Sequence, residues 1–139
     1  MRPSVTDQVI RTVETLRQVT LPQVADQASR RATESAIAGL ALIAEAWPRV
    51  LPFLVWDNAE MIRLLQERGL ATPSAPADSL DVEAHDLLNQ DLRLRLEALL
   101  AAGPGQPDPE ILEHLDKRAR RYPLRYVPTL NTGADSEER

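Results

Sequence analysis

Hydrophobic residues recur along this chain at intervals of three and four positions, which is the spacing of one face of an α-helix. The first such segment runs from about Thr6 to Val19. Its apolar stripe consists of Val9, Val13 and Leu16. Thr6 is suited to cap the helix, and Pro22 is expected to end or kink it.

The second segment, from about Gln23 to Trp47, is rich in small residues at helical spacing. We predict that these residues form a face that lets another helix approach closely: Ala28, Ala32, Ala36 and Gly39. Pro48 is expected to stop this helix, because proline lacks the backbone N–H that the helix interior needs. A third helix then follows, with Gly69 suited to the position just after its end.

The residues from Ala71 to Ser79 are rich in proline, serine and alanine, which is typical of a linker. A fourth helix is expected to open at Asp78 or Ser79 and to run to Ala102. Its apolar stripe consists of Ala84, Leu88, Leu92, Leu96 and Leu99. A shorter fifth helix is expected to be capped by Asp108, to start at Pro109 and to be halted by Pro123.

Signals for β-strands are nearly absent, because aromatic residues make up only 4% of the chain and no hairpin dipeptide joins alternating runs. The pattern therefore predicts an all-α, single-domain bundle of four main helices plus a shorter C-terminal helix. This bundle is expected to span residues 1–127. Residues 128–139 are expected to form a polar, flexible C-terminal tail.

The composition narrows the classes of function. The chain has 139 residues, no cysteine and a formal net charge of −5, so disulfides and thiolate chemistry are excluded and nucleic-acid binding is disfavoured. It contains no run of 18 apolar residues and no apolar segment typical of a secretory signal, so we expect no membrane span. These features agree with a cytoplasmic protein.

The motifs of the common catalytic and metal sites are missing. The five glycines build no phosphate-binding loop, and neither Ser35 nor Ser79 lies in a nucleophile motif. The histidines, His85 and His114, lack the Glu-x-x-His spacing of metal-binding bundles, and we interpret them as surface residues. We therefore predict no catalytic residue, no metal ligand and no cofactor.

A basic cluster near the C-terminus stands out in this acidic chain. It runs from Asp116 to Tyr126 and combines five cations with two tyrosines. One interpretation is that cations near a helix C-terminus only complement the helix dipole. The other is a surface that binds a partner protein or an anion, since arginine and tyrosine are enriched at interfaces. The residues proposed for it are Arg118, Arg121, Tyr122, Arg125 and Tyr126.

Three of the five aromatic residues, Trp47, Phe53 and Trp56, lie close together in the sequence. Aromatic side chains usually fill a core, although a group of them at the surface marks a docking site. We expect two of the three to lie in the core.

Four segments together resemble a known family. They read VTLPQVADQ, ATESAIAGLALIAEAW, LLNQDLRLRLEALLAAG and DPEILEHLDKRARRYPLRY. Over about residues 5–126 the chain resembles small helical proteins found with aminoglycoside-phosphotransferase-like kinases and acyl-CoA dehydrogenases, among them the accessory subunit of a 4-hydroxyacyl-CoA kinase. This resemblance implies a non-catalytic helical subunit that binds and stabilises a larger enzyme acting on CoA-linked acyl substrates.

Two hypotheses stay open from the sequence. In the first, the chain binds a larger, kinase-like or acyl-CoA dehydrogenase enzyme through the small-residue face or the arginine–tyrosine cluster. In the second, it self-associates into a homo-oligomeric bundle that binds a small molecule, as an enzyme or a carrier. A polar cavity lined by Glu34, Glu45, Asp57 or His85 would favour the second.

Overall fold

The protein is all-α. The structure, a computed structural model, describes residues 4–103 and 105–124, and no strand occurs among them. Four α-helices follow one another: α1 (Val5–Thr15), α2 (Gln27–Glu67), α3 (Val82–Ala102) and α4 (Pro109–Arg121). The predicted boundary between the bundle and the C-terminal tail lies outside the described residues.

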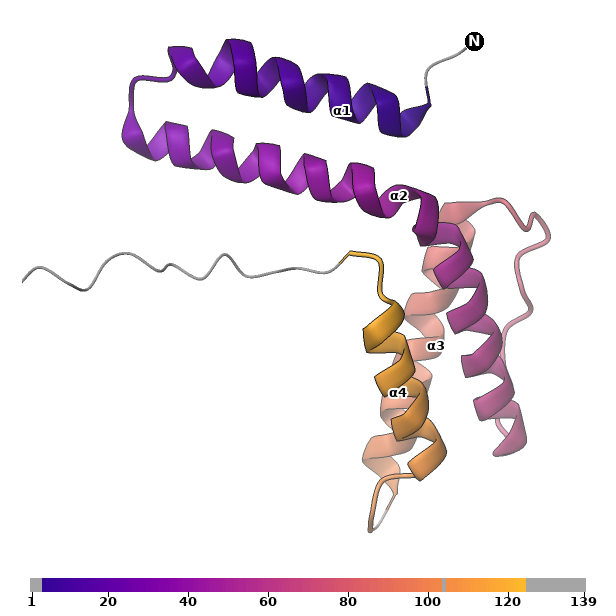
Figure 1. Cartoon of the computed structure of the whole chain (residues 1–139). Helices are drawn as coiled ribbons and strands as arrows, with labels where there is room; N and C mark the ends of the chain where they lie inside the picture. The colour runs from indigo at the N-terminus through magenta and orange to yellow at the C-terminus, as the bar shows by residue number, and fades with distance from the viewer. Residues whose placement is uncertain (1–3, 104, 125–139) are drawn as a thin grey trace, which may run out of the picture.

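Figure 1 shows that these helices form two parts that share α2. In the first part, which we call the arm, α1 lies alongside the first half of α2. In the second part, which we call the bundle, α3 and α4 lie against the second half of α2. The single helix α2 therefore belongs to both parts and connects them.

The prediction that Pro48 ends a helix is wrong, because α2 continues through both Pro48 and Pro52. Each proline removes one hydrogen bond and crowds the carbonyl of the preceding turn, which bends a helix without necessarily ending it. α2 changes direction near these prolines, where the arm meets the bundle (Figure 1). The predicted second and third helices are thus one bent helix, which packs on α1 before the bend and on α3 and α4 after it.

The ends of the helices are set by caps, some of which differ from the prediction. Ser4, not Thr6, caps α1, in a capping box with Asp7. The chain then leaves α1 through a π-helical turn at Leu16–Thr20 and a 3-10 turn at Leu21–Gln23. Asp81, not Asp78 or Ser79, caps α3, because its side chain accepts the N–H of Ala84 at 2.9 Å.

Other predicted boundaries are confirmed. Asp108 caps α4 and Pro109 is its first residue. Gly69 follows α2 with a φ of 74°, a left-handed conformation that glycine adopts without strain. α4 ends at Arg121, two residues before Pro123.

The hydrophobic core lies in the bundle. Its buried members come from α2, α3 and α4: Met61, Leu65, Leu88, Leu92, Leu96 and Ile111. The predicted stripe of α3 supplies three of them, Leu88, Leu92 and Leu96. In the arm, Val13 of α1 and Ile37 and Ala44 of α2 are buried, so the two arm helices share a thinner apolar seam.

Ion pairs at one end of the bundle join α2 and the segment just after it to α4. Arg68, directly after α2, contacts Asp108 at 2.6 Å and Glu110 at 3.0 Å. Arg63 lies 2.9 Å from Glu110. These contacts hold the N-terminus of α4 against the end of α2.

α2 is also long and apolar enough to cross a membrane by length and composition alone. The expectation of no span rests on the absence of an uninterrupted run of 18 apolar residues, whereas the apolar part of α2 includes charged residues. One such helix is weak evidence for a membrane span, because the core helix of a soluble protein and a signal sequence pass the same test.

Candidate functional site: a buried polar cluster beneath an arginine–aromatic surface

Polar side chains gather inside the bundle, between its three helices. Asp57 and Asn58 lie on α2, His85 and Asn89 on α3, and His114 and Arg118 on α4. The first five are buried, and Arg118 is largely covered. We call this set the buried polar cluster: Asp57, Asn58, His85, Asn89, His114 and Arg118.

Asn89 connects α3 to α2. Its side-chain amide donates to Asp57 Oδ2 at 2.7 Å and to Asn58 Oδ1 at 2.9 Å. Asn58 in turn donates to the backbone carbonyl of His85 at 2.9 Å. Because a buried polar group without a partner is costly, these bonds favour one register of α2 against α3.

Asp57 connects α2 to α4. Arg118 Nε donates to Asp57 Oδ2 at 2.8 Å, and His114 Nε2 lies 3.0 Å from Asp57 Oδ1. The second contact is not aligned with the ring N–H, so we regard it as an ion-pair contact that is charged only when the imidazole is protonated. Burial acts to raise the pKa of the Asp57 carboxyl, but the contacts with His114, Asn89 and Arg118 outweigh burial and lower it.

Aromatic rings extend the cluster towards the surface. The Arg118 guanidinium lies 5.7 Å from the ring centres of both Phe53 and Tyr122, whose rings meet edge to face at 5.4 Å. The Arg121 guanidinium lies 4.4 Å from the ring centre of Trp56. This is close enough for a cation–π interaction, which orients Arg121 at the surface.

The buried polar cluster is suited to holding the helices together. A general base must reach a proton of its substrate through a hydrogen bond, and the Asp57 side chain is fully buried. Both ring nitrogens of His85 are also buried and have no hydrogen-bond partner among the described residues. Within those residues no three acidic or histidine side chains gather as metal ligands would. We interpret the cluster as a structural lock between α2, α3 and α4.

The interpretation of both histidines as surface residues is therefore wrong. His85 is only 5% exposed and His114 only 4%. A signal for this was present, because each histidine lies on the apolar stripe of its helix. His85 precedes Leu88 and Leu92 at helical spacing, and His114 follows Ile111 by three positions.

The predicted arginine–tyrosine cluster divides into an inner and an outer part. Arg118 points inward to Asp57 and so is not available as a surface cation. Arg121 and Tyr122 lie at the surface, with Tyr122 40% exposed. Arg125 and Tyr126 lie outside the described residues. We call Arg121 and Tyr122, together with Trp56 of α2, which Arg121 contacts, the arginine–aromatic surface.

Neighbouring cations of the cluster behave as solvated residues of a helix end. Lys117 contacts Glu113 at 2.7 Å and Arg120 contacts Asp116 at 2.9 Å, both one turn away on α4. The helix-dipole interpretation therefore suits these two residues, but not Arg118.

The predicted small-residue face lies on the arm. Ala28, Ala32, Ala36 and Gly39 are all exposed. A Cβ atom added at Gly39 would meet nothing within 4 Å. No helix among the described residues covers this face, and α1 packs on a different side of α2.

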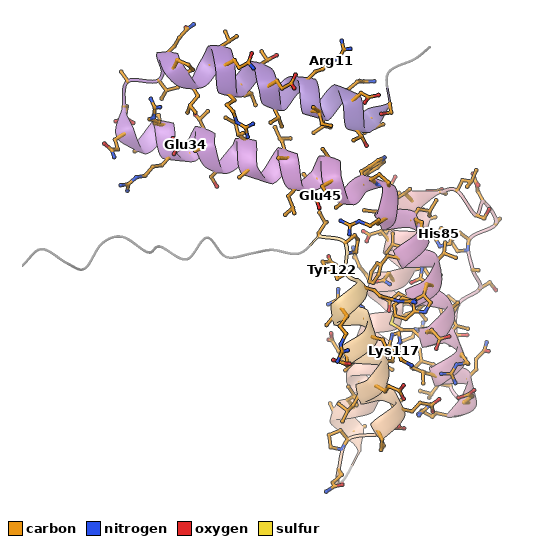
Figure 2. The ribbon with its side chains drawn as sticks, viewed as in Figure 1. Arg11, Glu34, Glu45, His85, Lys117 and Tyr122 are labelled. Carbon is orange, nitrogen blue, oxygen red and sulfur yellow. The ribbon has the colours of Figure 1, made fainter. Side chains whose placement is uncertain are left out.

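The structure does not bring together the four residues that would favour a small-molecule cavity. Glu34 and Glu45 lie on the arm and His85 lies in the bundle, as Figure 2 shows. Glu45 borders a hollow of about 360 Å³ between α1 and α2, whereas Asp57 and His85 belong to the buried polar cluster.

We compared the chain with protein-family models, with curated proteins and with solved structures, and no significant match was found in any of the three. The family resemblance described above stays a prediction.

Proposed function

We propose that this protein is a non-catalytic helical subunit that binds and stabilises a larger enzyme in the cytoplasm. The arginine–aromatic surface is the proposed contact. The class of enzyme, a kinase-like protein or an acyl-CoA dehydrogenase acting on CoA-linked acyl substrates, follows from the resemblance alone.

The observation that carries the proposal is the arrangement of Arg121 on Trp56 beside the exposed ring of Tyr122. Arg121 makes no ion pair with another described residue, so its charge is available to an acidic group. Its position on the indole ring reduces the freedom that it would lose on binding. Arginine, tyrosine and tryptophan are also the residue types that most often dominate binding energy at protein interfaces.

The inner residues support this surface. Phe53 packs edge to face against Tyr122, and Phe53 and Tyr122 flank the Arg118 guanidinium that binds Asp57. The surface is therefore built on the buried polar cluster, and it is held by the same helices that the cluster locks together. A pre-formed surface of this kind can bind a partner with little change in its own backbone.

The test is co-purification from the native host, with the bound protein identified by mass spectrometry. We expect the wild-type chain and an Arg93→Ala control, which removes an exposed arginine on α3, to recover the same enzyme. We expect the double variant Arg121→Ala with Tyr122→Ala to lose it while keeping its helical content in circular dichroism. Recovery of the wild-type chain alone, at full stability, would overturn the proposal.

A further inference from the structure

One face of the arm is apolar and uncovered. It carries six exposed residues on α2, at successive spacings of four, four, three, four and four positions: Ala28, Ala32, Ala36, Gly39, Ile43 and Trp47. We call this the arm face. Its two large side chains, Ile43 and Trp47, are 44% and 42% exposed, so the face presents large apolar groups as well as small residues.

The arm face continues the face of α2 that is buried in the bundle. After Ile43, the same helical spacing leads through Ala46, Val50 and Leu54 to Asp57 and Met61. Past the bend this face is covered by α3 and α4. From Ala28 to Ile43 its residues are exposed and have no cover among the described residues, although their composition is that of a helix–helix contact.

Charged residues along one edge of the arm face indicate what kind of molecule would cover this face. Arg31 and Arg49 are 18 positions apart, which is about five helical turns, so they lie on the same edge of the arm face. Both are exposed. Arg31 makes no ion pair with another described residue, and Arg49 only approaches Glu45 at 3.9 Å. The edge is therefore positively charged within an acidic protein.

A second copy of this chain is a poorer occupant than an acidic helix. In a symmetric antiparallel pair of helices, the same edge of each copy would face the other, which would bring the arginines of both edges together. A helix with an apolar stripe flanked by Asp or Glu would instead place opposite charges along that edge. The small residues from Ala28 to Gly39 would allow the two helix axes to approach to about 8 Å.

We propose that the arm face binds an amphipathic helix that has an apolar stripe and acidic flanks, supplied by the partner protein. This inference rests on the proposed function, because it names the kind of segment through which the larger enzyme is held. It adds a second contact, separate from the arginine–aromatic surface.

The test uses two synthetic helical peptides of about 20 residues, each with the same stripe of Ala and Leu. One carries Glu on both flanks of the stripe and the other carries Lys. Fluorescence anisotropy measures the binding of each labelled peptide to the full-length protein. We expect the Glu-flanked peptide to bind at least about tenfold more tightly than the Lys-flanked one, with affinity falling as salt rises.

Matched variants localise the binding. Arg31→Glu with Arg49→Glu is expected to reverse the preference between the two peptides. Gly39→Leu is expected to weaken both, because the free protein has room for the new side chain whereas a closely packed helix does not. Ala98→Leu, at an exposed position of α3, is expected to change neither.

Several outcomes would overturn the inference. Equal affinity for both peptides, or binding that Gly39→Leu leaves unchanged, would show that the arm face is not the site. A wild-type dimer in sedimentation equilibrium that Gly39→Leu dissociates would assign the face to a second copy. Cosedimentation with phosphatidylglycerol vesicles that is lost in Trp47→Glu would assign it to a membrane.

The proposed function can fail independently of this inference. If the Glu-flanked peptide binds with the expected preference but no enzyme co-purifies from the native host, the inference stands and the proposed function fails. If an enzyme co-purifies but Gly39→Leu and the charge reversal do not affect its recovery, the proposed function stands and the arm face is not part of the contact.

Discussion

The two halves of α2 present the same helical face to different surroundings. In the bundle that face is buried against α3 and α4, and it carries Asp57 and Asn58 among its apolar residues. In the arm it carries mainly alanine and glycine, and it is exposed. The bundle half has the large side chains and the polar contacts that fix one arrangement of helices. The arm half has mostly small side chains that permit close approach, together with the exposed Ile43 and Trp47, which suits a surface that binds another molecule.

The largest effect of a substitution on the free energy of unfolding is expected in the core of the bundle. Leu92→Ala removes a fully buried side chain, so we expect the free energy of unfolding to fall by about 2–5 kcal/mol, as measured by urea denaturation. Leu94→Ala, two positions away and 65% exposed, is the control and is expected to change it by less than about 0.5 kcal/mol. Equal effects from the two variants would mean that α3 does not present the stripe described above.

The buried polar cluster of the bundle is expected to stabilise the fold by an amount that depends on pH. Asp57→Asn removes a charged hydrogen-bond acceptor from Arg118 and Asn89. We therefore expect the free energy of unfolding to fall by about 2 kcal/mol at pH 7. The pKa of Asp57 is lowered in the folded state, so its contribution is present above the carboxyl pKa of the unfolded chain. That contribution is lost as the pH falls through the lower pKa of the folded state.

The difference in unfolding free energy between wild type and Asp57→Asn should therefore shrink between pH 7 and pH 3, because asparagine does not titrate. Denaturation curves across this range provide the measurement. Asp86→Asn, at an exposed position of α3, is the control and should differ little from wild type at any pH. A difference that stays constant for Asp57→Asn would show that its carboxylate is not stabilised by folding.

The smallest effect is expected on the arm face, at Gly39, which can be compared with Gly69 just after the end of α2. Gly39→Ala should raise the unfolding free energy by about 0.5–1 kcal/mol, because alanine favours a helix and the new methyl group meets nothing. Gly69→Ala should lower it, because φ is 74° at that position and a side chain there is strained. Thermal unfolding followed by circular dichroism measures both, and destabilisation by Gly39→Ala would show that the arm face is already covered.

Local sequence rules predicted the all-α architecture and the start of α4, because caps and apolar spacing act over a few residues. The aspartate–proline pair at Asp108 and Pro109 and the leucine stripe of α3 are of this kind. The continuity of α2 through Pro48 could not be predicted in this way. Packing on α1 before the proline and on α3 and α4 after it outweighs the local cost of the missing hydrogen bond.

The candidate site was only partly predictable for a similar reason. Arg121 and Tyr122 were identified by their residue types, which interfaces favour whatever the fold. The inward direction of Arg118 depends on Asp57, which lies 61 positions earlier in the chain and whose contact with Arg118 is set by the packing of α4 on α2. The burial of His85 and His114 follows from their positions on apolar stripes, which outweigh the polarity of the imidazole ring.

The prolines of α2 also affect how the protein could move. Pro48 and Pro52 offer no N–H to the carbonyl groups of Ala44 and Pro48, so α2 lacks two backbone hydrogen bonds that lie one turn apart. That place lies between the part of α2 held by α1 and the part held by α3 and α4. A change in the angle between the two parts would require no core residue of the bundle to leave its neighbours. With such a hinge, a molecule bound to the arm could change the angle between the arm and the bundle while the bundle moves as a rigid body.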